Sequence, residues 1–336
     1  MTECERQLQE MALSIQEARR EAGCDIKKAV PEPSLDAIPN LGGEARSGDC
    51  LVSMLASGSK GNSAYIRCGK TNILIDAGIS CRRIEQGLKR YGCSLGDLDA
   101  VFITHEHSDH VGGITTLLKR TDMPVYTTAE TWQAMGRKTE GFDHRFVRLT
   151  RRVALKDIEV TPFAISHDAA RPVGYSLRHG DAKITLATDL GFISPDVAAA
   201  AAYADILVLE ANHDEEMVRN GPYPYALQQR ILGRWGHLSN KTAASFLASL
   251  PTKGLMRVLL AHRSEKNNTP SLALHTMRTV LSQYGRVVGQ DILLRLACQD
   301  AASAFRKGVV TNYAAQTNPY GRRCRNPHRR RCLWRL

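Results

Sequence analysis

The segment Val101–His110 constrains the fold more than any other part of this 336-residue chain. A run of apolar and β-branched residues there leads directly into three histidines and an aspartate, namely His105, His107, Asp109 and His110. The run is typical of a buried strand, whose carboxyl end reaches the rim of a sheet. A tight loop at that rim can turn His105 and His107 one way and Asp109 and His110 the other, so that one segment serves two metal ions. The H-x-H-x-D-H spacing favours such a site over a solvated, histidine-rich loop.

Other strand-like runs along the chain also end in residues that can bind metals. These residues are Asp76, His167, Asp189 and His262. Taken alone, a histidine at a strand end is more often structural than a ligand. Asp189 carries two carboxylate oxygens, which can bridge a pair of metal ions. Imidazole and carboxylate together suit zinc, iron and manganese.

These residues together resemble the ligand pattern of the metallo-β-lactamase superfamily, in which H-x-H-x-D-H follows a strand. Four further sequence segments are similar to the YycJ/WalJ group of that superfamily, namely Leu55–Ser63, Ser166–Ala170, Glu210–Asp214 and Gly236–Asn240. Members of this group are associated with 5′-to-3′ exonuclease action on double-stranded DNA. The resemblance covers about residues 51–300 of the chain.

The resemblance implies an α/β fold, the αββα four-layer sandwich, with the site at one edge where strand-end loops converge. It assigns to one metal ion His105, His107 and His167. It assigns to the other metal ion Asp109, His110 and His262, with a bridging Asp189. Asp76 resembles a carboxylate that orients the metal-binding loop. Zinc is favoured because His107 stands where di-iron members carry glutamate, and manganese is the second candidate.

A pair of metal ions would acidify a bridging water and neutralise charge on an in-line phosphoryl transition state, which indicates phosphodiester hydrolysis. The residues expected to act in catalysis are Asp109, His110, Asp189, His213 and His237. His213 and His237 lie outside the superfamily's ligand positions, so we expect them to contact substrate or to support ligands. A hydrolase of a small thioester or lactone would use the same ligands and stays an alternative. A non-catalytic DNA-binding relative would have lost ligands, and none is missing.

The charge of the chain favours a polyanionic partner, because the formal net charge is +11.

Composition divides the chain into three predicted segments. Residues 1–49 form an extension with an amphipathic helix at about 3–22 and a Pro/Gly linker. Residues 50–305 form the catalytic domain, and 306–336 form a disordered, Arg-rich tail. The expected partners are double-stranded DNA, contacted in part through this tail, and DNA repair proteins. The oligomeric state stays open.

Cysteine and hydropathy patterns bear on the compartment. The chain has no apolar run of about 18 residues and no signal-peptide pattern at its start, so we expect a cytoplasmic protein without a membrane span. Its nine cysteines include no C-x-x-C pair, which favours reduced thiols over a disulfide framework. The aromatic residues Trp132, Tyr223, Tyr225 and Trp235 are either core residues or surfaces for base stacking, and the sequence does not separate these roles.

Overall fold

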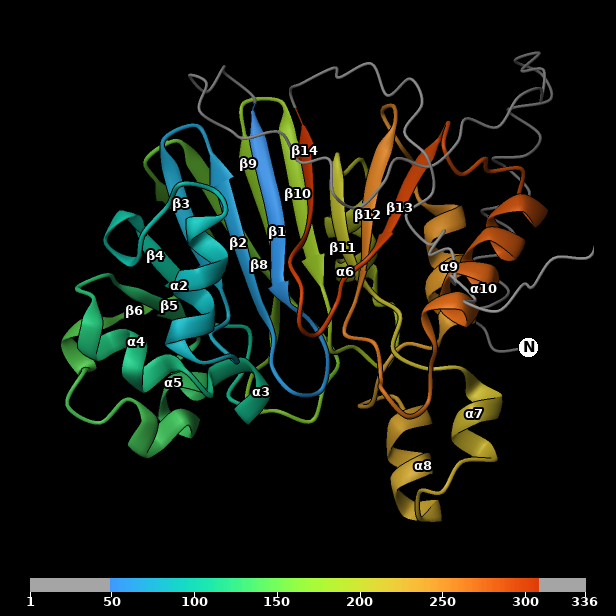
Figure 1. The fold of residues 1–336 in the computed structure, drawn as a ribbon, viewed down its shortest axis with the longest axis horizontal. Helices are drawn as coiled ribbons and strands as arrows, with labels where there is room; N and C mark the ends of the chain where they lie inside the picture. The colour runs from blue at the N-terminus through green and yellow to red at the C-terminus, as the bar shows by residue number, and fades with distance from the viewer. Residues whose placement is uncertain (1–48, 308–336) are drawn as a thin grey trace, which may run out of the picture.

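Two β-sheets packed face to face form the centre of the protein in the computed structural model (Figure 1). The structure describes residues 49–307. The predicted N-terminal helix, its linker and the Arg-rich segment from residue 308 onward lie outside the described residues. Arg306 and Lys307, which the sequence analysis placed in the tail, are part of the last strand of the first sheet.

The first sheet has a parallel half that delivers part of the candidate site. In spatial order its strands are β14 (Ser303–Lys307), β1 (Cys50–Ala56), β2 (Ser63–Cys68), β3 (Thr71–Ile75), β4 (Ala100–Phe102), β5 (Val125–Thr127) and β6 (Phe146–Arg148). Strands β14 to β3 pair antiparallel, whereas β3 to β6 pair parallel. Parallel strands end at the same edge of a sheet. Asp76 after β3 and His105 after β4 therefore emerge side by side.

The second sheet repeats this arrangement with its own parallel half. In spatial order its strands are β13 (Ile292–Leu296), β12 (Met256–Ala261), β11 (Ile206–Glu210), β10 (Ala182–Ala187), β9 (Val173–His179), β8 (Ile158–Ala164) and β7 (Val153–Leu155). Strands β10 to β13 are parallel. Their carboxyl ends carry Asp189, Glu210 and His262 to one edge, as strand-end placement in the sequence predicts.

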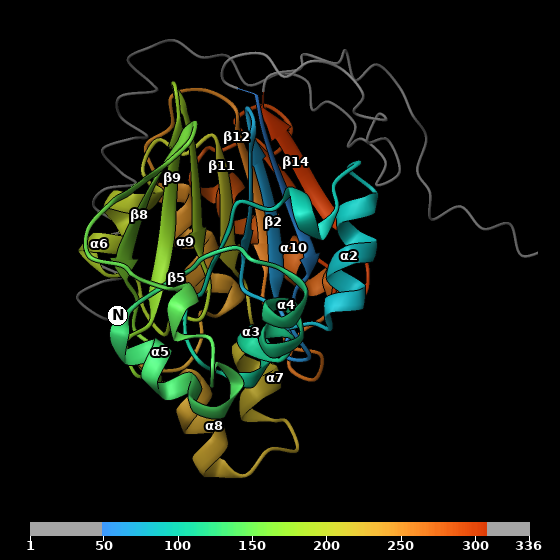
Figure 2. The ribbon, with the colours of Figure 1, turned by 90° about the vertical axis from the view of Figure 1, so that its left-hand side faces the viewer.

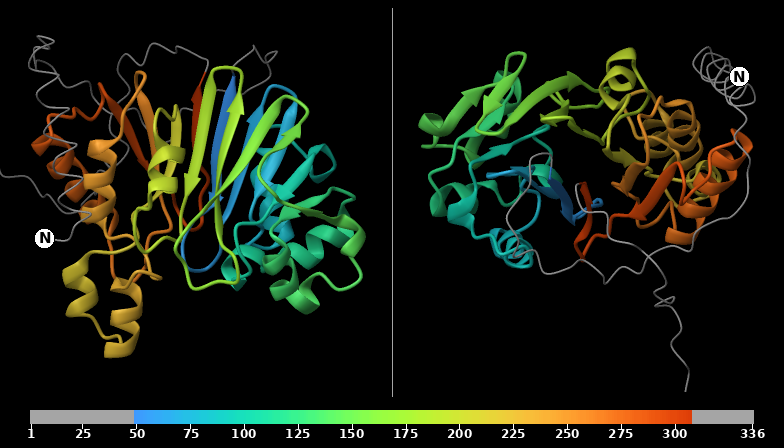
Figure 3. Two further views of the ribbon diagram at one scale, coloured as in Figure 1. Left: turned by 180° about the vertical axis from the view of Figure 1, so that it is seen from behind. Right: turned by 90° about the horizontal axis from the view of Figure 1, so that it is seen from above.

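Helices cover the outer face of each sheet. Helices packed on the first sheet are α2 (Cys81–Lys89), α4 (Ile114–Arg120) and α5 (Ala129–Met135). Those packed on the second are α6 (Pro195–Ala201), α9 (Asn240–Ser249) and α10 (Pro270–Gln283). Figure 2 shows α2 and α6 on opposite outer sides of the sheets, and Figure 3 gives the same layering from behind and from above. The remaining α-helices of the described residues lie at the site end and are α3 (Ser108–Val111), α7 (Glu215–Arg219) and α8 (Tyr225–Leu232).

Three apolar cores hold these layers together, one between the sheets and one under each set of helices. Strand β1 serves two of them, because successive side chains of a strand point to opposite faces. Val52 and Met54 contribute to the core between the sheets, whereas Leu51 and Leu55 contribute to the core that includes α2. Burial on both faces explains why β1 is apolar at every position except Ser53. The predicted αββα four-layer sandwich is confirmed.

The structure corrects one expectation and decides another. A disulfide joins Cys50 to Cys68, so the expectation of reduced thiols is wrong for this pair. The antiparallel register of β1 and β2 places the two cysteines directly opposite each other, a proximity that their separation along the chain does not show.

The structure decides between the two roles left open for Trp132. It is a core residue, 7% exposed, whose indole N–H donates to Asp143. None of the helices described between residues 49 and 307 is long and apolar enough to cross a membrane.

Candidate metal centre

Side chains from both sheets meet where the carboxyl ends of the parallel strands lie. The loop after β4 supplies His105 and His107, and α3, at the lower end of the molecule in Figure 1, supplies Asp109 and His110. The second sheet supplies the remaining candidate ligands, namely His167, Asp189 and His262. The structure therefore brings together all seven residues that the resemblance assigns to metal binding.

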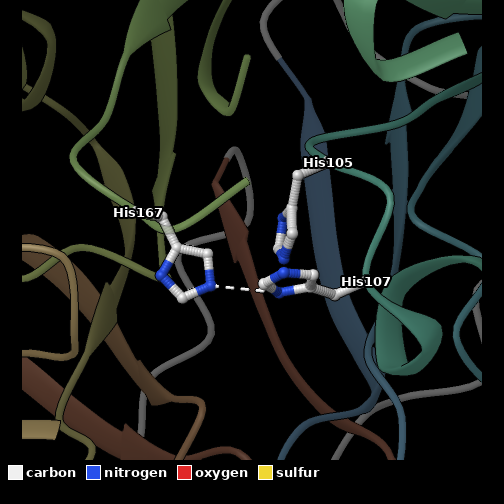
Figure 4. Close-up of side chains that lie close together, drawn as sticks. All are labelled: His105, His107 and His167. Carbon is white, nitrogen blue, oxygen red and sulfur yellow. Dashed lines mark hydrogen bonds between the residues drawn. The ribbon is translucent and has the colours of Figure 1, made fainter. Parts of the chain in front are cut away.

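Three imidazoles form one group of candidate ligands (Figure 4). Nε2 of His167 lies 3.3 Å from Nδ1 of His107, and one nitrogen of each of the three rings lies within 4.8 Å of the others. His105 and His167 are buried, whereas His107 is half-buried. The rings of His105 and His107 come from the first sheet and that of His167 from the second, so the two halves of the sandwich face each other across this point.

Asp109, His110 and His262 form a second group. Oδ2 of Asp109 lies 3.4 Å from Nε2 of His110 and 3.5 Å from Nε2 of His262. Burial raises the pKa of Asp109, but hydrogen bonds to His110 and His262 and their charges more than offset it and hold the pKa well below its usual range. The carboxylate is therefore ionised, as a metal ligand must be.

Asp189 lies between the two groups. Its Oδ2 is 3.4 Å from Nε2 of His110, while its Oδ1 is 3.1 Å from Nδ1 of His262 and 3.9 Å from Nε2 of His167. Burial raises the pKa of this carboxyl, and the charges of His262 and His110 outweigh burial and lower it. This placement suits the bridging role that the sequence analysis expects of Asp189.

The backbone is strained where the strands deliver these side chains. Asp76, Asp189 and His262 adopt φ values of 62°, 60° and 52°. A non-glycine residue in this left-handed region costs about 1–3 kcal/mol and persists only where its surroundings fix it. Each of the three follows a strand of a parallel half, so the strain occurs where the chain must turn its side chain into the centre.

A network of hydrogen bonds fixes the loop after β4. Oδ2 of Asp76 lies 2.7 Å from Nδ1 of His110, and both oxygens of Asp76 accept from the backbone N–H and hydroxyl of Thr104. Asp76 thus orients a candidate ligand, in agreement with the sequence analysis. Asn62 Nδ2 lies 3.2 Å from Oδ2 of Asp109 and 3.1 Å from Nε2 of His110. A side chain at Gly78 would collide with the carbonyl oxygen of Asp109, so only glycine lets these loops approach.

Glu210 is the functional residue that sequence reasoning left without a role. It closes β11, is completely buried, and its Oε1 lies 2.9 Å from Nδ1 of both His237 and His262. Its other oxygen accepts from the backbone N–H groups of Leu190 and Leu238. Burial raises the pKa of Glu210, but His237 and His262 outweigh burial and lower it below the usual range. A carboxylate that ends an otherwise apolar buried strand was the available signal.

The donor set fits divalent metal ions. Several buried atoms of the candidate ligands lack a hydrogen-bond partner, namely His105 Nε2, His167 Nδ1 and Asp189 Oδ2. Leaving one such atom unsatisfied costs about 1–3 kcal/mol, which coordination to a cation would offset. Burial lowers the pKa of His105 well below its usual value and also lowers that of His167. Both rings are therefore neutral, which is the form that binds metals.

Comparison with known families identifies the fold. Residues 71–262 match the beta-lactamase superfamily domain. The chain belongs to the metallo-β-lactamase superfamily. Among solved structures, the metallo-β-lactamase-fold protein YhfI from Bacillus subtilis aligns with a TM-score of 0.59 at 15% identity, covering 77% of this chain and 100% of that one. This structural likeness concerns the fold alone.

Two curated relatives are more similar in sequence to this metallo-β-lactamase-fold chain. The exodeoxyribonuclease YycJ of Bacillus anthracis is 37% identical over 241 residues, covering 71% of this chain and 91% of the relative. The exodeoxyribonuclease WalJ of Streptococcus pneumoniae is 37% identical over 256 residues, covering 75% and 95%. Together with the clustered candidate ligands, these relatives make the chain a metal-dependent hydrolase of the superfamily.

The two histidines outside the ligand pattern differ in their surroundings. His237 joins Asp189, Glu210 and His262 in one group of candidate ligands, and its side chain is 20% exposed. His213 is 1% exposed and its Nδ1 has no hydrogen-bond partner. Burial lowers the pKa of His213 to about 4. Its catalytic role therefore stays a prediction, whereas His237 lies at the centre itself.

Proposed function

We propose that this protein is a metal-dependent exonuclease that digests double-stranded DNA from the 5′ end. The observation that carries the proposal is the convergence of seven candidate ligand side chains in a chain that is 37% identical to exodeoxyribonucleases over nearly their whole length. The net charge of +11 supports a polyanionic substrate over a small thioester or lactone. The proposal places the protein in the cytoplasm, where DNA and DNA repair proteins would be its partners.

In this proposal the metal ions are held by the residues of the two groups. His105, His107 and His167 would hold one ion. Asp109, His110 and His262 would hold the other, with Asp189 shared between them. When bound, such a pair supplies an acidified water and positive charge opposite the phosphoryl group. Zinc suits the many imidazole nitrogens, and manganese is the second candidate.

In this proposal His237 is the general acid that protonates the leaving group. Glu210 accepts a hydrogen bond from Nδ1 of His237, which leaves Nε2 as the atom that faces away from the carboxylate. Held in this orientation by Glu210, His237 can carry a proton at Nε2 and pass it to the departing sugar oxygen. Asp189 Oδ1 lies 4.0 Å from Nδ1 of His237, which places the ring beside the proposed metal ions.

End-labelled substrates test this function. Metal-stripped protein would be supplied with zinc or manganese and incubated with duplex and single-stranded DNA and RNA, each labelled at the 5′ or the 3′ end. The proposal expects immediate release of the 5′ label as a mononucleotide from duplex DNA, and a gradual shortening of the 3′-labelled strand. A thioester of glutathione serves as the competing substrate. Turnover of the thioester without cleavage of any nucleic acid would overturn the proposal.

A further inference from the structure

A helical hairpin stands beside the centre with little of its surface buried. Helices α7 and α8 project from the lower end of the molecule in Figure 1. Helix α8 has no buried residue, although β11, which ends nearby, is buried throughout, and β12 is buried at every position except Arg257. Arg230 of α8 pairs with Asp168, and just after the helix the guanidinium of Arg234 lies over the ring of Phe192.

Trp235 follows this hairpin and is 62% exposed. The other exposed large hydrophobic side chains of residues 49–307 are Tyr203, Tyr225 and Leu255. Tryptophan is enriched at binding interfaces, where its large ring contributes apolar contact area and its N–H finds a hydrogen-bond partner. Trp235 lies two residues before His237, whose ring centroid is 5.2 Å from that of His167 and 5.1 Å from that of His262.

The backbone that carries Trp235 is fixed on both sides. Before it, Arg234 packs so closely on Gly191 that a side chain at Gly191 would meet the Arg234 carbonyl oxygen at 2.3 Å. After it, the buried Gly236 donates to the Gly233 carbonyl, and the next residue donates to the Ile231 carbonyl at 3.1 Å. A flat aromatic ring on a rigid loop loses little conformational entropy when it binds a second flat surface. Trp235 is therefore preorganised for stacking.

The charges around Trp235 suit a nucleotide. Arg230 and Arg234 lie on the same segment and are exposed, while Asp168 is already engaged by Arg230. Bases stack on aromatic side chains beside cations that follow the phosphate backbone, which is the usual composition of single-strand binding surfaces. This combination disfavours a purely apolar protein partner.

We propose that Trp235 stacks on the base of the nucleotide at the DNA end that enters the centre, with Arg234 beside the adjoining phosphate. The inference rests on the proposed nuclease function and deepens it. An exonuclease must separate the terminal base from its partner before the end can reach buried ligands, and unstacking costs a few kcal/mol. An exposed tryptophan two residues before His237 would replace the lost base stacking. Trp235 is then a residue that positions substrate without touching the metal ions.

The test compares the metal-loaded, full-length protein with Trp235→Ala and Trp235→Phe on two 5′-phosphorylated duplexes. One duplex ends in an ordinary nucleotide and the other in an abasic one. We expect Trp235→Ala to raise KM for the ordinary duplex by about five- to a hundredfold with unchanged metal content, and Trp235→Phe to raise it less. The abasic end should raise KM for the wild type by a similar factor but leave the KM of Trp235→Ala almost unchanged. Tyr203→Ala, an exposed aromatic before β11 at the opposite end of the sheet, is the matched control.

The outcomes separate the two proposals. The stacking inference is overturned if the wild type and Trp235→Ala show the same KM for the ordinary duplex. It is also overturned if the abasic end raises KM equally for both proteins. In either case the nuclease function stands. If the wild type cleaves no DNA with any metal tested, the proposed function fails, and the inference that rests on it fails too. An equal effect of Tyr203→Ala would assign the change to general surface binding and would also overturn stacking at Trp235.

Discussion

Oε1 of Glu210 lies 2.9 Å from Nδ1 of His237. The same oxygen lies 2.9 Å from Nδ1 of His262. One buried carboxylate therefore orients both the histidine proposed to move a proton and a histidine proposed to hold a metal ion. Glu210 anchors both histidines, but replacing one or the other should have different effects on catalytic rate and on metal content.

Replacing His237 with alanine should slow DNA hydrolysis without removing metal. We expect kcat to fall by about 10²–10⁴-fold, the usual effect of losing a general acid, with the metal content of the wild type. For a phosphodiester whose leaving group departs without a proton, kcat should fall much less. Metal analysis and kcat on both substrates measure this, with His275→Ala on the exposed face of α10 as the histidine control. Loss of a metal ion from His237→Ala would show that His237 is a ligand.

Replacing Asp189 with alanine should release metal from both groups. Its two oxygens lie toward His110 on one side and toward His262 and His167 on the other, so its removal weakens both proposed sites. We expect loss of hydrolysis together with a reduced metal content by elemental analysis. Asp99→Asn, a half-buried carboxylate that precedes β4 and pairs with Lys156, is the control and should keep its metal. Two tightly held ions in Asp189→Ala would refute the bridging assignment.

Much of this centre could be predicted because its ligands sit at strand ends that are visible as apolar runs. The spacing from His105 to His110 is local, so the sequence contains it directly. Glu210 is different, because its role depends on two histidines that approach it only after β11, β12 and the loop before α9 have packed. The Cys50–Cys68 disulfide likewise depends on strand register. The strain at Asp189 and His262 follows from tertiary packing, and no local pattern of sequence encodes it.

The metal-free protein should lose stability at alkaline pH. Burial lowers the pKa of His262, but Asp189 and the hydrogen bonds to Asp109 and Glu210 outweigh it and raise the pKa to about 10. A histidine with a raised folded pKa contributes stability that is complete below its unfolded value near 6.5 and is lost as pH rises to about 10. The loss is at most about 5 kcal/mol. Urea unfolding of chelator-treated protein between these pH values measures it, and the His262→Gln variant should show a flatter dependence.

His213 should prove to be structural. Because it is 1% exposed, His213→Ala would leave a cavity and lower the free energy of unfolding by about 2–4 kcal/mol. We expect unchanged metal content and a kcat within about threefold of the wild type at a temperature where the variant is folded. Denaturant melts and single-turnover rates test this together. A large drop in kcat for a folded, metal-loaded variant would instead support the catalytic role that the sequence analysis expects of His213.

The basic segment after the last strand should strengthen DNA binding without changing catalysis. Its arginines are Arg322, Arg323, Arg325, Arg329, Arg330, Arg331 and Arg335, and no acid lies among them. Cutting after Lys307 spares β14, whose Arg306 pairs with Asp49, whereas a cut two or three residues earlier would damage the sheet. Arginines that contact phosphates release counterions, each adding about 0.9 to the slope of log affinity against log salt.

We therefore expect the truncated protein to bind duplex DNA more weakly and with a flatter salt dependence, while kcat at saturating DNA is preserved. Full-length variants provide the matched comparison. Replacing the seven arginines with lysines keeps the charge and should keep most of the salt slope, whereas replacing them with glutamines should reproduce the truncation. Fluorescence anisotropy over a range of salt concentrations measures both quantities. An affinity and slope equal to those of the wild type in the glutamine variant would show that this segment does not contact DNA.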